Sequence, residues 1–406
     1  MACRKCSFRK KLNRYSDNSR TQPVYLDYNA TTPVDIRVLG IYEKTSRLNW
    51  ANPSSFHSAG QGAFQFLESK RKEMAEYLNI GPPENLFFTY SSIGALSSSL
   101  KLFLDEKKIK TIITTEIEHS SVYRALESIS DKSVEQVPLS VDCNGRINLD
   151  DLEKVLKTGK AILVFSPVNH ETGSVQEYEN IFLLAERYSS FVIFDAIQTL
   201  SRIDIIRWSQ YCHSFVISSH KIYGPKGIVL LYISPYAKIS IDDTSCVQES
   251  GLFPGTENLP LIASFTEAIR IYSENIKSDL HHYDILTEEA YSILEQSSVN
   301  YCRETPENSV PGILSISLTQ ADISMEELFL FLYKEKICIS RFSACSGEIE
   351  GPSKILSAMG RAEDHSNQSL RISLGRESQR SDIYSLVKAL KTFLTGQNQK
   401  KKSHYY

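Results

Sequence analysis

One lysine in the middle of the chain has the surroundings of a reactive amine. Lys221 lies in the run Ser-Ser-His-Lys-Ile-Tyr-Gly-Pro-Lys-Gly (218–227), which begins where a hydrophobic segment ends and breaks into a Gly/Pro turn. A lysine at the carboxyl end of a buried strand is partly desolvated, which lowers its pKa and frees the amine as a nucleophile. Ser218 and His220 are able to donate hydrogen bonds to a phosphate. A surface lysine in a turn is the alternative, and it is the commoner case for a lysine taken alone.

An acidic residue ends the hydrophobic segment before this one. Asp195 follows the apolar run 191–194, and a buried carboxylate is costly unless a cation lies beside it. The protonated ring nitrogen of pyridoxal phosphate is such a cation, since enzymes that use this cofactor need a carboxylate to keep its ring an electron sink. Gln198, three residues on, is placed to reach the phenolic oxygen of that ring. An Asp that caps the following helix is the alternative.

Two further segments of the same kind end in imidazoles. Glu118-His119 follows 111–115, and Asn169-His170 follows 161–168. The imidazole of His119 could lie flat on a cofactor ring, although an isolated histidine in such a place more often has a structural role. Four successive predicted strands thus end in polar residues (His, Asn/His, Asp/Gln and Ser/His/Lys), which would lie together at one edge of a sheet. This convergence indicates an active site more strongly than any one of the residues does.

The segments around these residues have the pattern of an α/β fold. Short apolar, β-branched runs predict buried strands at 86–89, 111–115, 161–168, 191–195, 213–218 and 228–233. Apolar residues at helical spacing predict helices at 93–104, 121–129, 149–156 and 178–188. Such alternation implies a mainly parallel sheet with helices on both faces. Ligands of these sheets bind at the carboxyl ends of the strands, where the chemical residues lie.

The pattern changes after about residue 260, which indicates a second, smaller α+β domain. A long helix is expected from 261 to about 295, followed by a strand at 313–318, a helix at 324–336, a strand at 370–374 and a helix at 382–394. The predicted organisation is a basic tail at 1–22, a large cofactor-binding domain at 23–265, a small domain at 266–396 and a Lys-rich tail at 397–406.

Composition and charge exclude several classes of protein. The 406-residue chain has a formal net charge of −3, so it has no overall electrostatic footprint for nucleic acid or an anionic membrane. No apolar run approaches the about 20 residues that span a bilayer. The eight cysteines are too sparse and irregular for a secreted disulfide framework, which favours reduced thiols in the cytoplasm. Residues 1–22 are basic and acid-poor, so a mitochondrial transit peptide is the alternative.

The motifs together resemble those of cysteine desulfurases of the NifS/IscS type, which are class V aminotransferases of fold type I. The resemblance runs from Tyr25 to about Leu394, and the motifs at Lys221 and Cys345 make it highly specific. It is carried by Tyr-Leu-Asp-Tyr-Asn-Ala-Thr-Thr-Pro (25–33), Asn-Pro-Ser-Ser-Phe-His (52–57), the motifs at Asp195 and Lys221, Gly-Thr-Glu-Asn (255–258), Ser-Ala-Cys (343–345) and Arg-Ile-Ser-Leu-Gly-Arg (371–376).

The resemblance implies a role for each residue at a matching position. Lys221 holds pyridoxal 5'-phosphate as a Schiff base and moves protons, and His119 stacks on the ring. Cys345 attacks the sulfur of the substrate L-cysteine, which leaves L-alanine and a persulfide for a sulfur-acceptor protein in iron–sulfur cluster assembly or tRNA thiolation. Arg371 and Asn29 bind the substrate. The implied cofactor contacts are Asp195, Gln198, His119, His170, Ser218, His220, Ser91, Ser92 and, from the second subunit of a homodimer, Thr256.

Four departures from the family pattern affect the same site. The phosphate loop reads Thr-Tyr-Ser-Ser-Ile-Gly (89–94), so a serine at 91 or 92 replaces the usual hydroxyl, and His170 stands where a second Asn is usual. The segment Gln-Glu-Ser-Gly (248–251) lacks the usual arginine, and Phe342 replaces the Gly before Ser-Ala-Cys. The backbone N–H groups at the start of the next helix are still able to bind phosphate.

These departures weaken the polar contacts to the phosphate and leave the chemical core intact. We therefore expect a divergent but active cysteine desulfurase. A selenocysteine lyase or another class V enzyme, which would keep Lys221 without depending on Cys345, is one alternative. A degenerate, non-catalytic family member that acts as a binding protein in sulfur transfer is the other.

Overall fold

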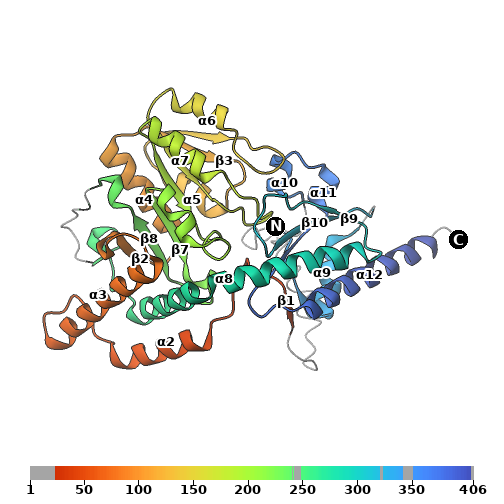
Figure 1. The fold of residues 1–406 in the computed structure, drawn as a ribbon, viewed down its shortest axis with the longest axis horizontal. Coiled ribbons are helices and arrows are strands. Elements are labelled where there is room, and N and C mark those ends of the chain that lie inside the picture. The colour runs from red at the N-terminus through yellow and green to blue at the C-terminus, as the bar shows by residue number, and fades with distance from the viewer. Residues whose placement is uncertain (1–22, 240, 242–247, 321–322, 342–350, 404–406) are drawn as a thin grey trace, which may run out of the picture.

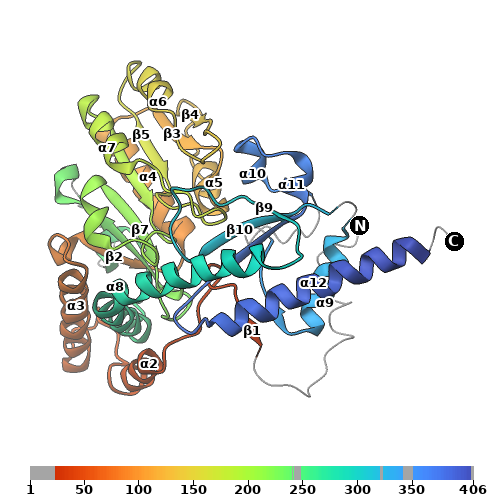
Figure 2. The same cartoon turned by 45° about the vertical axis from the view of Figure 1, so that its right-hand side comes forward.

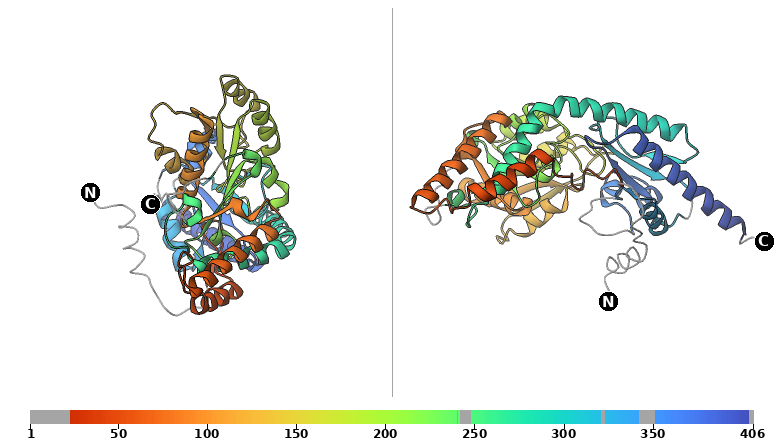
Figure 3. Two further views of the ribbon diagram at one scale, coloured as in Figure 1. Left: turned by 90° about the vertical axis from the view of Figure 1, so that its left-hand side faces the viewer. Right: turned by 90° about the horizontal axis from the view of Figure 1, so that it is seen from below.

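The structure is a computed structural model that describes residues 23–239, 241, 248–320, 323–341 and 351–403, with side chains up to residue 397 (Figure 1). Two lobes of unequal size lie side by side, and one long helix runs from the larger lobe into the smaller (Figure 3, right). None of the helices in these ranges is both long and apolar enough to cross a membrane.

A seven-stranded sheet forms the centre of the larger lobe. Its strands are β2 (Leu86–Thr89), β3 (Thr111–Thr115), β4 (Glu135–Leu139), β5 (Ile162–Phe165), β6 (Phe191–Asp195), β7 (Ser214–Ser218) and β8 (Val229–Ile233). They are ordered β2-β8-β7-β6-β5-β3-β4. The five strands from β7 to β4 are parallel, whereas β8 is antiparallel to both of its neighbours. The carboxyl ends of β3, β5, β6 and β7 therefore meet at one edge of the sheet.

Helices cover both faces of this sheet (Figure 2). They are α3 (Ser58–Leu78), α4 (Ser92–Lys107), α5 (Ser120–Glu127), α6 (Leu149–Leu156), α7 (Tyr178–Arg187) and α8 (Leu259–Glu295), and α2 (Ile36–Leu48) packs on α8. Alternate side chains of β6 show the two layers, since Val192 and Phe194 pack in the core formed with α3, α6, α7 and α8. Ile193 packs in the opposite core, formed with α4 and α5.

The smaller lobe is built on a three-stranded antiparallel sheet. Its strands are β9 (Tyr301–Arg303), β10 (Ile313–Leu318) and β12 (Ser369–Ser373), in the order β12-β10-β9. A two-stranded parallel pair, β1 (Val24–Tyr25) with β11 (Ile337–Cys338), lies beside it. The remaining helices are α9 (Met325–Lys334), α10 (Lys354–Ala358), α11 (Glu363–Asn367) and α12 (Arg380–Ser403).

Helix α8 links the hydrophobic cores of the two lobes. Its side chains up to Ile276 pack in the core of the large sheet, and those from Tyr283 onward pack in the core of the small one. Leu26, from the start of the described chain, also packs in the small core. The predicted boundary at 265/266 stays a prediction, and the two cores separate further along the same helix.

The α/β fold class predicted from the sequence is confirmed, and most predicted elements lie within a few residues of the observed ones. Strand β5 is shorter than the predicted 161–168 because Pro167 has no N–H to donate to a sheet. Helices α2 and α3 and strand β4 lie outside the predicted elements. Helix α12 continues to Ser403, so the predicted tail from residue 397 is helical over most of its length. The predicted basic tail at 1–22 lies outside the described residues.

Candidate active site

The carboxyl edge of the parallel strands brings the predicted chemical residues together. Asp195 ends β6, and it lies opposite Val216 of β7 in the sheet register. Ser218 ends β7, and the 3₁₀ turn Ser219–Lys221 follows it directly. His119 caps the helix that follows β3. The residues that follow β5 contribute His170, whose ring meets that of His119 edge to face at a centroid distance of 4.9 Å and an interplanar angle of 88°.

Asp195 is a buried carboxylate to which the described residues offer neutral donors. Its side chain is 4% exposed, its Oδ2 accepts a hydrogen bond from Ser121 Oγ (3.0 Å), and its Oδ1 accepts one from the Ile197 N–H (3.2 Å). No lysine, arginine or histidine of the described residues forms an ion pair with it. Burial raises the pKa of Asp195, and the positive charge of Lys221 partly opposes that rise. The site therefore favours a cation next to this carboxylate.

Lys221 lies within electrostatic reach of this whole group. Its Nζ donates a hydrogen bond to the Ala30 carbonyl at 3.1 Å and another to the Asn29 carbonyl. Burial, helped by the charge of Lys221, lowers the pKa of His119 to about 4. The pKa of His170 also falls well below its usual value, because of burial first and then of His119, Arg371 and Lys221. Both imidazoles are therefore neutral at physiological pH, as an aromatic stacking partner should be.

Asn29 connects the start of the described chain to this edge. Its Oδ1 accepts hydrogen bonds from Gln198 Nε2 (2.9 Å) and Arg202 NH2 (2.8 Å), and its Nδ2 donates to the His170 carbonyl (3.2 Å). Gln198 is itself buried, and within the described residues its Oε1 has no hydrogen-bond partner. The amide of Gln198 is thus only half satisfied, which leaves it capacity for a ligand.

Arg371, the predicted substrate clamp, reaches the same place from β12 of the small lobe. It is 2% exposed, and its NH2 pairs with Asp27 Oδ1 at 3.0 Å. Its NH1 donates to the His170 carbonyl at 3.2 Å, and its Nε has no hydrogen-bond partner in the described chain. The guanidinium is therefore positioned by groups that leave part of its donor capacity for an anionic ligand.

The residues predicted to bind phosphate lie around the end of β7. Thr89, at the end of β2, and Ser218 both pair with Val229 of β8, so the two strand ends flank a single strand. Ser91 follows Thr89 and caps α4 by accepting a hydrogen bond from the Gly94 N–H at 3.1 Å, and Ser92 is the first residue of that helix. The start of α4 therefore lies near the turn that carries Lys221.

His220, Thr256 and Cys345 are the remaining predicted site residues. The Nδ1 of His220 lies 3.1 Å from Thr31 Oγ1, and burial lowers the His220 pKa to about 4. Thr256 is exposed and lies three residues before α8, and no described contact connects it to the site. Cys345, with the rest of its Ser-Ala-Cys motif, lies outside the described residues.

Sequence reasoning missed three residues that shape the site. Ser121 links His119 to Asp195, since its Oγ also lies 2.8 Å from His119 Nδ1. Arg202 is buried and holds Asn29. Glu118 is fully buried, accepts hydrogen bonds from Thr115 Oγ1 (2.6 Å) and Ser166 Oγ (2.8 Å), and has a pKa that burial raises to about 7. The available signal was the position of Glu118 and Ser121 on either side of His119.

Comparison with known proteins identifies the family. The sequence profile described as "Aminotransferase class-V" matches residues 24–386. The chain belongs to this family. Members similar to it include the mitochondrial cysteine desulfurase of Saccharomyces cerevisiae, which is 31% identical over 384 residues that cover 93% of this chain and 76% of the relative. The cysteine desulfurase IscS of Serratia proteamaculans is 30% identical over 369 residues, which cover 89% and 90%.

Solved structures agree with this assignment. A NifS-like protein superimposes with a TM-score of 0.81 at 28% identity, over 92% of this chain and all of the other. The NifS-like protein of Rickettsia africae gives a TM-score of 0.79 at 25% identity, over 92% of this chain and all of the other. The resemblance to the NifS/IscS type that the motifs predicted is confirmed.

Proposed function

We propose that this protein is a pyridoxal-phosphate-dependent cysteine desulfurase. The observation that carries the proposal is that Lys221, in the turn after β7, and Asp195, at the end of the neighbouring β6, lie at one edge of the sheet, and that Asp195 is a buried carboxylate with no ion-pair partner in the described chain. A lysine and an acid arranged in this way suit a cofactor that needs an amine for attachment and a carboxylate for its ring nitrogen. The similarity to cysteine desulfurases over about nine tenths of the chain supports desulfuration of cysteine as the reaction.

The residues present fit this cofactor. Asp195 would pair with the ring nitrogen, the neutral His119 would stack on the ring, and the half-satisfied amide of Gln198 would reach the phenolic oxygen. When bound, pyridoxal phosphate supplies an electron sink for the bonds around the substrate α-carbon. The phosphate would be held by the start of α4 with Ser91 and Ser92, by Ser218 and His220, and by Thr256 from the partner of a homodimer. His170 would lie near the ring.

Exposed apolar side chains support the homodimer. Ile36 is 77% exposed, Trp50 75%, Phe56 97% and Tyr90 79%. They come from α2 and from the segments that lead into α3 and α4, and Tyr90 directly precedes Ser91. Contiguous patches of such side chains mark interaction surfaces, and we propose that these four lie in the subunit interface. A protein that is monomeric at micromolar concentration would contradict this part of the proposal.

The residues of the chain divide the reaction between them. Arg371 and Asn29 would orient L-cysteine, with the free donor of the Arg371 guanidinium on the substrate carboxylate. Lys221 would carry protons to and from the substrate carbons. The Cys345 thiolate would attack the substrate sulfur, so that the carbon–sulfur bond breaks, a sulfur–sulfur bond forms, and the carbon takes up a proton to leave L-alanine. The enzyme persulfide then carries one sulfur atom to an acceptor protein.

The destination of the sulfur is part of the proposal. Iron–sulfur cluster assembly and tRNA thiolation are the two processes we propose, with the acceptor a protein rather than a nucleic acid bound directly. We propose a cytoplasmic location, and a mitochondrial location is the alternative because several similar proteins, including that of Saccharomyces cerevisiae, are mitochondrial.

Two steps of one experiment test the proposal. The purified protein should be yellow, and Lys221→Ala should abolish the visible absorbance, whereas the exposed Lys226→Ala in the same turn should retain it. In the presence of a thiol reductant, which reduces the persulfide sulfur to sulfide, release of alanine and sulfide from cysteine should then vanish in Cys345→Ser and persist in Cys143→Ser. Protein that stays colourless after pyridoxal phosphate is added would refute the enzyme. Undiminished turnover in Cys345→Ser would indicate a lyase that does not need this thiol.

A further inference from the structure

Three side chains of metal-binding types meet at the outer strand of the small sheet. The Cys302 Sγ, a carboxylate oxygen of Glu304 and a ring nitrogen of His365 all lie within 4.8 Å of one another. Cys302 is a free thiol in strand β9, and His365 comes from α11. None of the three belongs to the site around Lys221, so their proximity needs an explanation of its own.

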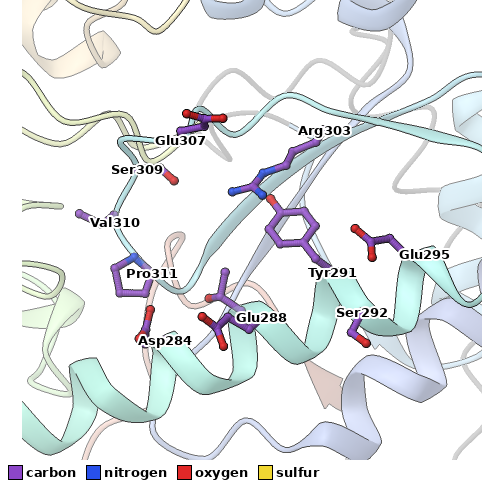
Figure 4. Close-up of a pocket in the computed structure, with 11 residues that line it drawn as sticks. Asp284, Glu288, Tyr291, Ser292, Glu295, Arg303, Glu307, Ser309, Val310 and Pro311 are labelled. Carbon is purple, nitrogen blue, oxygen red and sulfur yellow. The ribbon is translucent and has the colours of Figure 1, made fainter.

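The fold brings these side chains together from two separate elements. Cys302 and Glu304 are two residues apart in extended chain, so their side chains share one face. Arg303 between them points to the opposite face, where its guanidinium lies 4.1 Å from the centre of the Tyr291 ring (Figure 4). His365 is fixed above the first face, because Ser317 of β10, the register partner of Cys302, donates a hydrogen bond to the His365 carbonyl at 2.8 Å.

The carboxylate at the centre of the group is buried but poorly satisfied. The side chain of Glu304 is 1% exposed. Its Oε1 lies 3.0 Å from His365 Nδ1, and its Oε2 lies 3.0 Å from the Nε of Arg361. Neither contact has the alignment of a hydrogen bond, so among the described residues both oxygens lack an aligned partner. Buried polar atoms are rarely left in this state unless water, a ligand or an ion completes them.

We propose that Cys302, Glu304 and His365 bind a divalent metal ion of the zinc class, with water in the fourth position. Sulfur, nitrogen and oxygen ligands in tetrahedral geometry are the donor set that zinc prefers. The nitrogen and oxygen ligands of a zinc tetrahedron lie about 3.3 Å apart, and the His365–Glu304 separation of 3.0 Å needs little adjustment to match it. On binding, the Cys302 thiol releases its proton to water and the sulfur bonds to the metal.

The remaining neighbours suit this arrangement. Arg361 would stay on Oε2 and orient the carboxylate, as groups around metal ligands commonly do. The side chain of His365 is 33% exposed and Cys302 is half-buried, so an ion is able to enter from solvent. The bound ion would join β9 to α11 and so tie the outer strand of the small lobe to the helix beyond it.

Metal titration of the full-length, cofactor-loaded protein tests this proposal. Every variant, including the parent, should carry Cys3→Ser, Cys6→Ser and Cys345→Ser, because these thiols are other soft ligands. After treatment with a chelator, the parent should bind one equivalent of Cd²⁺ with a thiolate-to-metal absorption in the ultraviolet, and Zn²⁺ should displace it. Cys302→Ser should lose this absorption and weaken Zn²⁺ binding by more than about 100-fold. The exposed Cys143→Ser is the matched control and should behave as the parent.

A second set of variants separates a metal site from a structural ion-pair cluster. His365→Gln should weaken Zn²⁺ binding as Cys302→Ser does, while the exposed His281→Gln should not. Zn²⁺ should raise the thermal unfolding midpoint of the parent and of Arg361→Ala, but not that of Cys302→Ser. Two results would overturn the proposal: a parent that binds no Cd²⁺ or Zn²⁺, and a Cys302→Ser variant that binds as tightly as the parent, which would indicate adventitious binding elsewhere.

Discussion

Two buried carboxylates of the large lobe are held in opposite ways. Glu249 is 6% exposed and accepts hydrogen bonds from Arg71 NH1 (3.0 Å) and NH2 (2.9 Å) and from the Phe88 N–H (2.8 Å). Asp195 is buried to a similar degree, yet among the described residues only a hydroxyl and one backbone N–H donate to it, and none of their cations pairs with it. Both acids lie near strand ends of the same sheet.

The difference separates a structural acid from one that is ready for a ligand. Burying a carboxylate costs several kcal/mol, and a guanidinium that binds both of its oxygens offsets much of that cost. Glu249 has this compensation and anchors a turn in which it and Ser250 adopt positive φ values of 45° and 52°. Asp195 has no such guanidinium among the described residues, and burial without a cation raises its pKa. The pyridinium of the proposed cofactor would supply the missing charge.

Asp195→Asn tests the functional role of the uncompensated carboxylate, and it should have the largest effect of the substitutions, a loss of activity. The amide keeps the shape of the side chain but no longer stabilises a positive ring nitrogen, so kcat for alanine formation should fall by about 1,000-fold. The free energy of unfolding of the cofactor-free protein should rise, because the variant no longer buries an uncompensated carboxylate. The exposed Asp150→Asn serves as the control. A variant that keeps wild-type kcat would remove Asp195 from the proposed cofactor contacts.

Glu249→Ala tests the structural role of the compensated carboxylate, and it should lower the stability of the fold. Arg71 would be left as a buried charge without its main partner, so urea denaturation should show a loss of about 3 to 5 kcal/mol. Glu68 contacts the same guanidinium at 3.2 Å from an exposed position. Glu68→Ala should therefore cost less than about 1 kcal/mol. Equal losses in the two variants would show that burial does not distinguish these ion pairs.

Glu118 is a third buried carboxylate of the large lobe, and its ionisation should make the stability of the fold depend on pH. Burial raises its pKa from 4.5 to about 7, so the folded protein binds more protons than the unfolded chain between those values. Its contribution to stability is therefore complete below pH 4.5 and is lost as the pH rises through 7. Between pH 4.5 and 8, wild type should lose ~3 kcal/mol of unfolding free energy relative to Glu118→Gln.

The difference in unfolding free energy between wild type and Glu118→Gln reports the titration of Glu118 separately from that of the nearby histidines. The lowered pKa values of His119 and His220, both about 4, make stability fall as the pH drops below 6.5, and this effect is common to both proteins. Denaturation at matched pH values, with the exposed Glu116→Gln as a control for the loss of a charge, gives the comparison. Parallel stability curves for wild type and Glu118→Gln would show that Glu118 ionises normally in the fold.

The strand ends were predictable because local pattern determines them. The predicted ranges 111–115 and 191–195 match β3 and β6 residue for residue, since both are short β-branched or aromatic runs closed by polar residues. Parallel strands then bring their carboxyl ends to one edge, which is why His119, Asp195 and Lys221 were expected together. The reversed direction of β8 was not predicted, because a run of apolar residues has no strand direction in its local pattern.

Contacts between distant residues could not be read from the sequence. The hydrogen bond from Arg202 to Asn29 joins residues 173 positions apart, and it depends on how the start of the chain crosses the sheet. Arg71 and Glu249 are 178 positions apart, and although Glu249 lies in the motif segment 248–251, nothing in the local sequence identifies Arg71 as its partner. Helix α2 was missed for a different reason, since Ile36 and Leu39 on it are exposed and blur the apolar stripe that marks an amphipathic helix.

Ser121→Ala gives the smallest expected effect, and it tests whether the two halves of the site act together. The Ser121 hydroxyl donates to Asp195 and lies 2.8 Å from His119 Nδ1, so its loss removes one contact from each side chain, while the Ser121 N–H still donates to His119 Nδ1. We expect kcat to fall by about 10-fold with an unchanged KM for cysteine, and the pH titration of the cofactor absorbance to shift. Ser120→Ala, exposed and adjacent, should change neither quantity. A purely structural role for Ser121 would lower stability and leave the titration where it is, because the charge on Asp195 would then be set by burial alone.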